Sequence, residues 1–184
     1  MARVIVVGDG PAGLSAALFL AKNGQEVVVY GQDDTPMHYA ELHNYLGFPE
    51  INGTEFQRIA RAQVIEQGAT IREEQVVQVA HDGDAFVVER AEGGQDRGDY
   101  LVIAGGKAAQ RLVEQLGAER RDGRVVDSAY RTGVDGVYAV GRVARPNRSQ
   151  AIISAGAGAA AALDILAREA GRDVTDWDTP PQND

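Results

Sequence analysis

Cysteine is absent from the 184 residues of this chain. Its absence excludes disulfides, thiolate nucleophiles, dithiol–disulfide exchange and cysteine-based metal sites as functions of the chain. Positive charge is also scarce, since 27 acidic residues outnumber 18 basic ones and give a formal net charge of −9. Such a balance disfavours nucleic acid and anionic membranes as the main partners.

Long apolar runs are missing as well. The β-branched run Val4–Val7 is too short for the apolar part of a signal peptide, and the alanine-rich run at 151–163 is too short and too weakly apolar to span a bilayer. We therefore expect a cytoplasmic protein without a membrane partner. The length predicts one domain, over residues 1–171, followed by a polar tail over 172–184.

The first thirty residues carry the most informative motif. Val4–Val7 predicts a buried strand, a helical pattern follows over residues 12–23, and Val27–Tyr30 predicts a second strand. The turn between strand and helix reads G-x-G-x-x-G, a pattern in which the glycines allow a tight turn, a close approach by pyrophosphate, and close helix–strand packing. The motif predicts a dinucleotide site at the start of the helix, and a purely structural glycine turn is the alternative. Its glycines are Gly8, Gly10 and Gly13.

Further strands and helices alternate along the rest of the chain. Residues 37–49 lack periodicity and favour a ligand-lining loop or a short irregular helix. Thr54 and Gln57 form a capping box that predicts a helix to about residue 67, and a second helix is expected over residues 107–116. The remaining patterns predict strands at 70–72, 75–80, 85–90, 100–104, 125–126 and 137–140.

The last helix is expected from an N-cap at Ser149 to Gly171. It carries no charge from Gln150 to Leu163 and contains Gly156 and Gly158. Each of these glycines costs about 1 kcal/mol of helix propensity relative to alanine. We therefore expect a buried helix that other backbone approaches closely at both glycines.

Taken in order, these motifs resemble the FAD domain of thioredoxin reductases and related flavoproteins with two dinucleotide folds. The matching segments are Gly8–Leu14, His43–Pro49 (similar to E-N-Y-P-G-F-P), Leu101–Gly106 (similar to V-I-A-T-G), Thr132–Gly141, and Gln150–Gly156 (similar to Q-A-I-x-S-A-G). The resemblance implies an α/β fold, a single Rossmann-like FAD-binding domain in which helices and a small antiparallel β-meander accompany a parallel sheet.

The resemblance also implies that one domain of the family is missing from the middle of the chain. In the family, an NADPH-binding domain with a C-x-x-C disulfide lies between the A-T-G strand and the last strand. Here that interval is residues 107–122. The expectation is an FAD half alone, with its two segments joined directly and unable to reduce thioredoxin by the family's mechanism.

Cofactor-binding residues follow from the resemblance and the glycine motif together. Three positions depart from the family: Gly31 stands where an acidic residue holds the ribose, Gly105 replaces a threonine, and Arg142 replaces the aspartate that binds the ribityl chain. Asp33 is a substitute for the missing acidic residue, at poorer geometry. The full expected set is Gly8, Gly10, Pro11, Ala12, Gly13, Gly31, Gln32, Asp33, Asn44, Val76, Ala104, Gly105, Gly106, Gly141, Arg142, Gln150 and Ala151.

Arg142 cannot replace an aspartate chemically, because a guanidinium has only donors. It could instead form a bidentate pair with the dianionic pyrophosphate of FAD. Arg145 and Arg148 extend this basic patch in an acidic chain. The alternative is a solvated, arginine-rich loop in a chain whose only lysines are Lys22 and Lys107.

His38, Glu41 and His43 lie close together in the sequence. Their spacing matches no helical pair of metal ligands, and we expect no metal site. Either histidine could act catalytically, as a proton donor to reduced flavin or to substrate. A plain surface role is the alternative for both.

The sequence favours an FAD-dependent oxidoreductase that receives electrons from an external donor or reductase partner, whose identity the sequence leaves open. One alternative is a non-catalytic module that binds FAD or another adenine nucleotide as a sensor or scaffold. A redox subunit of a larger complex is a further alternative. Homodimers are common in the resembling family, and we expect one here.

Overall fold

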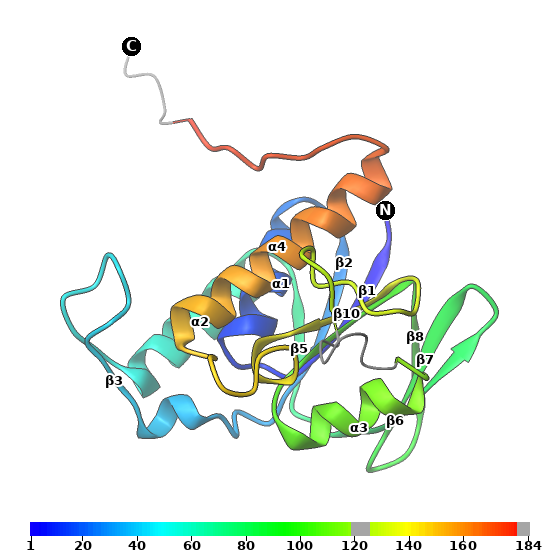
Figure 1. Cartoon of the computed structure of the whole chain (residues 1–184), viewed down its shortest axis with the longest axis horizontal. Helices are drawn as coiled ribbons and strands as arrows, with labels where there is room; N and C mark the ends of the chain where they lie inside the picture. The colour runs from blue at the N-terminus through cyan, green and yellow to red at the C-terminus, as the bar shows by residue number, and fades with distance from the viewer. Residues whose placement is uncertain (119–125, 180–184) are drawn as a thin grey trace.

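A five-stranded parallel sheet lies at the centre of the computed structural model, which describes residues 1–118 and 126–179 (Figure 1). Its strand order is β10-β9-β1-β2-β5. A three-stranded antiparallel sheet, β6-β7-β8, and the short pair β3-β4 complete the strands. The elements in chain order are β1 (Arg3–Val7), α1 (Pro11–Lys22), β2 (Glu26–Tyr30), the 3₁₀ helix η1 (Pro36–Tyr39), β3 (Glu41–Leu42), β4 (Ile51–Asn52), α2 (Gly53–Glu66), β5 (Thr70–Arg72), β6 (Val76–Asp82), β7 (Ala85–Arg90), β8 (Gln95–Gly98), β9 (Tyr100–Ala104), α3 (Lys107–Gln115), β10 (Val137–Val140), the 3₁₀ helix η2 (Gly141–Val143) and α4 (Ala151–Ala170).

Both faces of the parallel sheet are covered, which explains its continuous apolar strands. Successive side chains of β1 point to opposite faces, so Val4 and Val6 pack with α1 and α4. Ile5 and Val7 belong instead to a second core, made with β6, β7 and α3. The fold therefore has three layers, and the α/β architecture with a parallel sheet and a small β-meander is confirmed.

The order in which strands are added to the parallel sheet reverses beside β1. The chain builds outward from β1 through β2 to β5 and then returns to place β9 on the other side of β1. β9 pairs in turn with β10, and residues 105–136 between them are too few for a second dinucleotide-binding fold. The expected direct joining of the two segments is confirmed.

Helix α4 packs closely on α1 at one of its two glycines. A Cβ atom at Gly158 would lie 2.0 Å from the carbonyl oxygen of Ala12, a distance that no side chain tolerates. Nothing lies within 4 Å of a Cβ built at Gly156, leaving aside the local backbone of the helix. The expected close approach of other backbone is therefore confirmed at Gly158 and wrong at Gly156.

Helix α4 is longer than the apolar run recognised in the sequence. Its 20 residues, with a mean hydropathy of 1.4, are long and apolar enough to cross a membrane by length and composition alone. The expectation that the run at 151–163 is too short and too weakly apolar to span a bilayer is therefore wrong by this criterion, because the helix continues to Ala170. Ala157, Ala161 and Ile165 are buried in the core with α1 and the sheet, and 33% of the apolar window of α4 is buried in all.

Polar contacts hold α4 against β10. The Tyr138 hydroxyl donates to Asp164 Oδ2 at 2.6 Å, and Arg131 Nε donates to the same oxygen at 2.7 Å. Gly171 ends the helix as a left-handed C-cap with φ of 65°, as expected from the sequence.

Helix starts and short strands are where the sequence-based expectations were wrong. The side chain of Asn52, not Thr54, caps α2 by accepting from the Thr54 amide at 3.0 Å. Gln150, not Ser149, is the N-cap residue of α4, and its side chain makes no capping hydrogen bond. Strands β3, β4 and β8 were not expected. Val126 is not in a strand, and Val125 lies outside the described residues.

Candidate nucleotide-binding site

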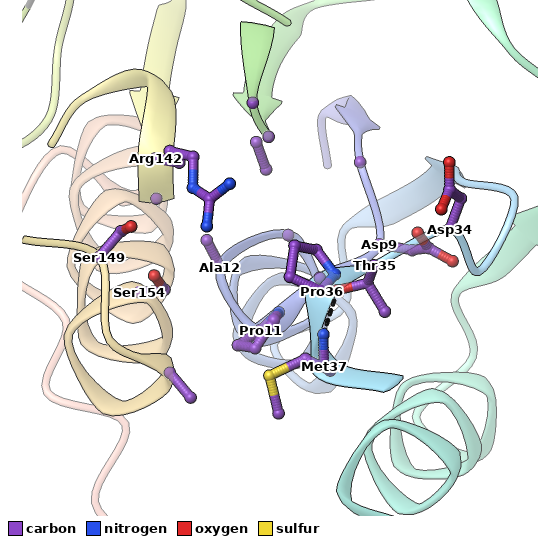
Figure 2. Close-up of a pocket in the computed structure, with 18 of the residues that line it drawn as sticks. Asp9, Pro11, Ala12, Asp34, Thr35, Pro36, Met37, Arg142, Ser149 and Ser154 are labelled. Carbon is purple, nitrogen blue, oxygen red and sulfur yellow. Dashed lines mark hydrogen bonds between the residues drawn. The ribbon is translucent and has the colours of Figure 1, made fainter. Parts of the chain in front are cut away.

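A pocket of about 460 Å³ opens at the carboxyl ends of β1, β9 and β10 (Figure 2). It lies at the point where the strand order reverses around β1, which is where open α/β sheets bind their ligands. Five segments line it: the glycine loop after β1, the segment around η1, the glycines after β9, the start of η2, and the start of α4.

The glycine loop is built by backbone contacts at two of its glycines. A Cβ at Gly8, whose φ is 108°, would lie 1.6 Å from the Ala104 carbonyl oxygen, and one at Gly13 would lie 1.8 Å from the Gly8 carbonyl oxygen. Both positions therefore require glycine for the fold itself. Gly10 differs, because its nearest contact would be Thr35 Oγ1 at 3.5 Å, an ordinary van der Waals distance. Its missing side chain leaves space in the pocket rather than in the core.

Three helices begin at the pocket and present positive dipole ends to it. The residues at the starts of α1 and α4 line the pocket, as does Gly106, the N-cap of α3. None of the three has an acidic residue in its first turn or a side-chain cap. No described residue accepts a hydrogen bond from the Ala12 or Gly13 amide. These free amides form a site suited to an anion.

Arg142 adds a full positive charge to the same part of the pocket. Its side chain extends from η2 into the pocket, on the side where α1 begins (Figure 2). The residue is exposed, so its guanidinium remains accessible to a ligand. The pocket thus has a cationic side formed by one arginine and the helix ends.

The other end of the pocket, toward β2, is acidic. Asp34 lines it, and so does Asp9, the variable residue that follows the first glycine of the loop. Asp9 is 5% exposed, and its Oδ2 accepts from the Asp33 amide at 3.0 Å and from Arg61 Nη1. Burial raises the pKa of the Asp9 carboxyl, against the opposing effects of the Asp33 amide and the Arg61 charge.

Helix α2 supplies the groups that hold Asp9. The fully buried side chain of Gln57 donates from Nε2 to the Asp9 carbonyl oxygen at 2.6 Å, instead of returning to Thr54 as a capping box. Arg61 uses its second nitrogen, Nη2, to bind Glu73 at 2.8 Å. One residue of the glycine loop is therefore fixed by two side chains from a helix almost fifty residues away in sequence.

Most of the expected cofactor-binding residues lie in the pocket. Those that line it are Gly8, Gly10, Pro11, Ala12, Gly13, Ala104, Gly105, Gly106, Gly141, Arg142 and Ala151. Eight further residues line the pocket that were not in the expected cofactor-binding set, although Met37 and Tyr39 belong to the run 37–49 that was expected to line a ligand: Asp9, Asp34, Thr35, Pro36, Met37, Tyr39, Ser149 and Ser154. The aperiodic run from Met37 was a signal for the η1 residues, while nothing in the motif distinguished Asp9.

Six expected residues are not among those that line the pocket. Val76 is buried in the second core, with the meander, on the opposite side of the sheet from α1. Asn44 and Gln150 lie near the start of α4, where Asn44 Nδ2 donates to Gln150 Oε1 at 3.3 Å. The remaining three are Gly31, Gln32 and Asp33.

The two histidines are also outside the pocket lining. His38 Nε2 lies 2.8 Å from the Asp33 carbonyl oxygen, which can only accept, so this nitrogen carries a proton. In the neutral ring, Nδ1 then accepts from Thr54 Oγ1 at 3.0 Å. His43 is exposed, and its Nδ1 lies 3.9 Å from Glu50 Oε2. No group of three potential metal ligands occurs within residues 1–118 and 126–179.

One family model matches most of the chain. The model describes pyridine nucleotide-disulphide oxidoreductases and aligns with residues 2–52 and 41–162. These segments include every strand of the parallel sheet and the start of α4.

Two curated relatives match parts of the chain at similar identity. A ferredoxin–NADP reductase of Frankia alni is 31% identical over 111 residues, covering 56% of this chain and 35% of the relative. A thioredoxin reductase of Aquifex aeolicus is 31% identical over 127 residues, covering 67% of this chain and 39% of the relative. The matches thus span well under half the length of either relative.

Solved structures of thioredoxin reductases share the fold. One from Gloeobacter violaceus superimposes with a TM-score of 0.84 at 18% identity, over 97% of this chain and 99% of the other. A ferredoxin-flavin thioredoxin reductase from Clostridium acetobutylicum gives a TM-score of 0.77 at 17% identity, over 93% and 99% of the two chains. At such identities the likeness concerns the fold alone.

Proposed function

Because the chain belongs to the pyridine nucleotide-disulphide oxidoreductase family, we propose that it is an FAD-binding flavoprotein of the thioredoxin reductase-like type. It acts as an oxidoreductase that exchanges electrons with an external donor and acceptor. The absence of cysteine removes dithiol exchange from its chemistry. Reducing equivalents therefore enter and leave through another molecule.

The observation that carries this proposal is the convergence of three helix N-termini and Arg142 on one side of the pocket. The pyrophosphate of FAD is a dianion that suits both free amides and a guanidinium fork. The free amides of Ala12 and Gly13 would hold the pyrophosphate, and the open space at Gly10 would give it room. The residues that line the phosphate side therefore fit the group. At position 142 a donor stands where the family has an acceptor for the ribityl chain, so Arg142 would pair with the pyrophosphate and leave the ribityl chain without that acceptor.

The start of α4 provides the electrostatic environment for the rest of the cofactor. FAD supplies the electron-carrying ring when bound. Ser149 and Ala151 line the pocket, and the amides of Ala151, Ile152 and Ile153 have no acceptor among the described residues. The positive end of this helix stabilises negative charge that develops nearby. Met37 and Tyr39, on η1, also line the pocket.

The visible absorption spectrum of the purified protein tests the proposal most directly. We expect a flavin spectrum as purified or after addition of FAD, bleaching under dithionite, and reoxidation by an added acceptor. A thermal-shift series with FAD, NAD and ADP-ribose then compares ligands, and FAD should stabilise most. A protein that neither carries nor takes up FAD contradicts the proposal.

A second candidate is a non-catalytic nucleotide-binding module. The specific observation in its favour is that neither His38 nor His43 lines the pocket, so no acid–base side chain of the expected pair faces a bound ring. Stronger stabilisation by NAD or ADP-ribose than by FAD favours this module. A cytoplasmic location and a homodimer remain proposals, which fractionation and light scattering test.

A further inference from the structure

Gly31 and Asp9 occupy the same space in this fold. A Cβ atom at Gly31 would lie 2.1 Å from Asp9 Cγ and 2.4 Å from both Asp9 Cβ and Oδ1. Gly31 follows β2 directly, and dinucleotide-binding folds place an acidic side chain at the end of this strand for the ribose hydroxyls. The chain therefore has no side chain at that position because a carboxylate from the glycine loop already fills it.

We propose that Asp9 supplies the ribose-binding carboxylate from the glycine loop, and that it accepts a hydrogen bond from a hydroxyl of the adenosine ribose. The inference rests on the proposed nucleotide function and deepens it. It identifies one residue that determines which nucleotides the pocket accepts. It also explains Asp9 and Gly31 together, because the carboxylate comes from the glycine loop at Asp9 and not from the end of β2 at Gly31.

The position of Asp9 supports this role. It lines the pocket, lies one residue from the Gly10 backbone that meets the pyrophosphate, and occupies the acidic end together with Asp34. A ribose lies next to the pyrophosphate in any adenine dinucleotide. A carboxylate within one residue of the phosphate loop is therefore at the right distance along the ligand to meet that sugar.

The surroundings of Asp9 hold its carboxylate in one orientation. Arg61 and the Asp33 amide both bind Oδ2, which fixes the plane of the group. Gln57, from the same helix as Arg61, holds the backbone carbonyl of Asp9. A carboxylate oriented in advance loses little freedom when it binds a ligand. Asp33, the substitute expected from the sequence, does not line the pocket, whereas Asp9 does.

Asp9 could alternatively serve only to anchor α2 through Arg61. A purely structural role predicts that Asp9→Gly and Arg61→Met lower the melting temperature and weaken all nucleotides alike. A ribose-binding role predicts a change that depends on the ribose hydroxyls. The decisive readout is therefore discrimination between nucleotides, not stability.

The experiment compares ADP with 2′-deoxy-ADP and 3′-deoxy-ADP by calorimetry. The wild-type protein should bind at least one deoxy analogue about tenfold more weakly than ADP, the size expected for a hydrogen bond to a charged group. Asp9→Gly should bind ADP and that analogue equally. The exposed Asp82, which pairs with Arg97 on the far hairpin, provides a matched control: Asp82→Asn should keep the discrimination.

A reciprocal exchange tests the shared space. Gly31→Glu alone should lower the melting temperature, because its Cβ collides with Asp9. Asp9→Gly combined with Gly31→Glu should restore both stability and ribose discrimination. Glycine is required at position 9, since even an alanine Cβ would lie 2.4 Å from the new one.

The outcomes separate this inference from the proposed function. A wild-type protein that binds neither FAD nor ADP overturns the nucleotide function and the role of Asp9 together. A protein that binds FAD while Asp9→Gly retains full ribose discrimination overturns the inference alone. Loss of discrimination in Asp9→Gly with rescue in the double variant supports both.

Discussion

The phosphate side of the pocket is formed by backbone contacts, whereas the rim is formed by exposed side chains. On the phosphate side, backbone packs on backbone at Gly8, Gly13 and Gly158, where an added Cβ would lie 1.6–2.0 Å from a carbonyl oxygen. The rim, by which we mean Tyr39 and the segment 43–48 beside the start of α4, presents exposed side chains such as those of Tyr39, Leu46 and Phe48. The phosphate side is determined by steric necessity, while the rim depends on which side chain occupies each position.

The largest expected effect tests the backbone-built half at α4. Gly158→Ala forces a Cβ to within 2.0 Å of the Ala12 carbonyl oxygen, so α1 and α4 must separate. We expect a loss of about 3 kcal/mol in the free energy of unfolding, at the upper end of overpacking costs. Urea denaturation followed by circular dichroism measures it.

Gly156 provides the matched control in the same helix. Its added Cβ meets nothing within 4 Å beyond the local helix backbone, so Gly156→Ala should stabilise by about 0.5–1 kcal/mol through helix propensity. Equal destabilisation by the two alanines would show that glycine matters here for the helix itself and not for its contact with α1.

The second prediction separates folding from binding within the glycine loop. Gly10→Ala should leave the free energy of unfolding of the apoprotein within about 0.5 kcal/mol, because the nearest atom would be 3.5 Å away. The same Cβ enters the space proposed for the pyrophosphate and should weaken FAD by about a hundredfold, or 2.7 kcal/mol. FAD titration and urea melts on one preparation measure both quantities.

Gly13→Ala is the comparison variant for this prediction. It should lose stability as well as FAD binding, since its Cβ would lie 1.8 Å from the Gly8 carbonyl oxygen. Unchanged FAD affinity in Gly10→Ala would contradict the placement of the pyrophosphate on this loop.

A third, smaller effect concerns Arg142, whose charged side chain lines the cationic side of the pocket. Arg142→Gln should weaken FAD by about tenfold, as expected for losing one charge-assisted contact. The salt dependence of FAD binding should become shallower in this variant. Arg148, which is exposed and does not line the pocket, provides the control: Arg148→Gln should bind FAD as the wild type does.

An FAD affinity that is the same in Arg142→Gln and in the wild type would contradict the pairing of Arg142 with the pyrophosphate. The helix ends alone would then hold it, and Arg142 would belong to a solvated loop.

The difference between backbone-built and side-chain-built parts of the site also explains how much of it could be predicted from the sequence. Strands β1, β2, β9 and β10 followed from apolar runs, since strands buried on both faces leave a continuous signal. The glycine loop followed from spacing, because only glycine satisfies its backbone contacts. Most of the expected residues that line the pocket lie in these segments or follow them directly: Gly8, Gly10, Pro11, Ala12, Gly13, Ala104, Gly105, Gly106 and Gly141.

The positions that could not be predicted depend on side chains meeting across long sequence separations. Asp9 occupies the variable position of its motif, and its partners Gln57 and Arg61 come from α2. The N-cap of α2 is Asn52 and not Thr54. Gln57, which would have completed the capping box, is buried and donates to the Asp9 carbonyl oxygen instead. Local propensity favoured a capping box at Thr54, and a tertiary hydrogen bond outweighed it.

The smallest effects should come from the rim. The hydrogen bond from Asn44 to Gln150 is exposed and 3.3 Å long, so Asn44→Ala should change the free energy of unfolding by no more than about 0.5 kcal/mol. His43→Ala should likewise leave stability and FAD affinity unchanged, because the imidazole is exposed and its nearest acidic oxygen is 3.9 Å away. Urea melts and FAD titrations measure both variants. If His43→Ala instead slows reoxidation of the dithionite-reduced protein while FAD affinity stays constant, the histidine reaches the reacting atoms after ligand binding. The rim segment 43–48, although outside the pocket lining, would then take part in the chemistry, while the phosphate side would serve binding alone.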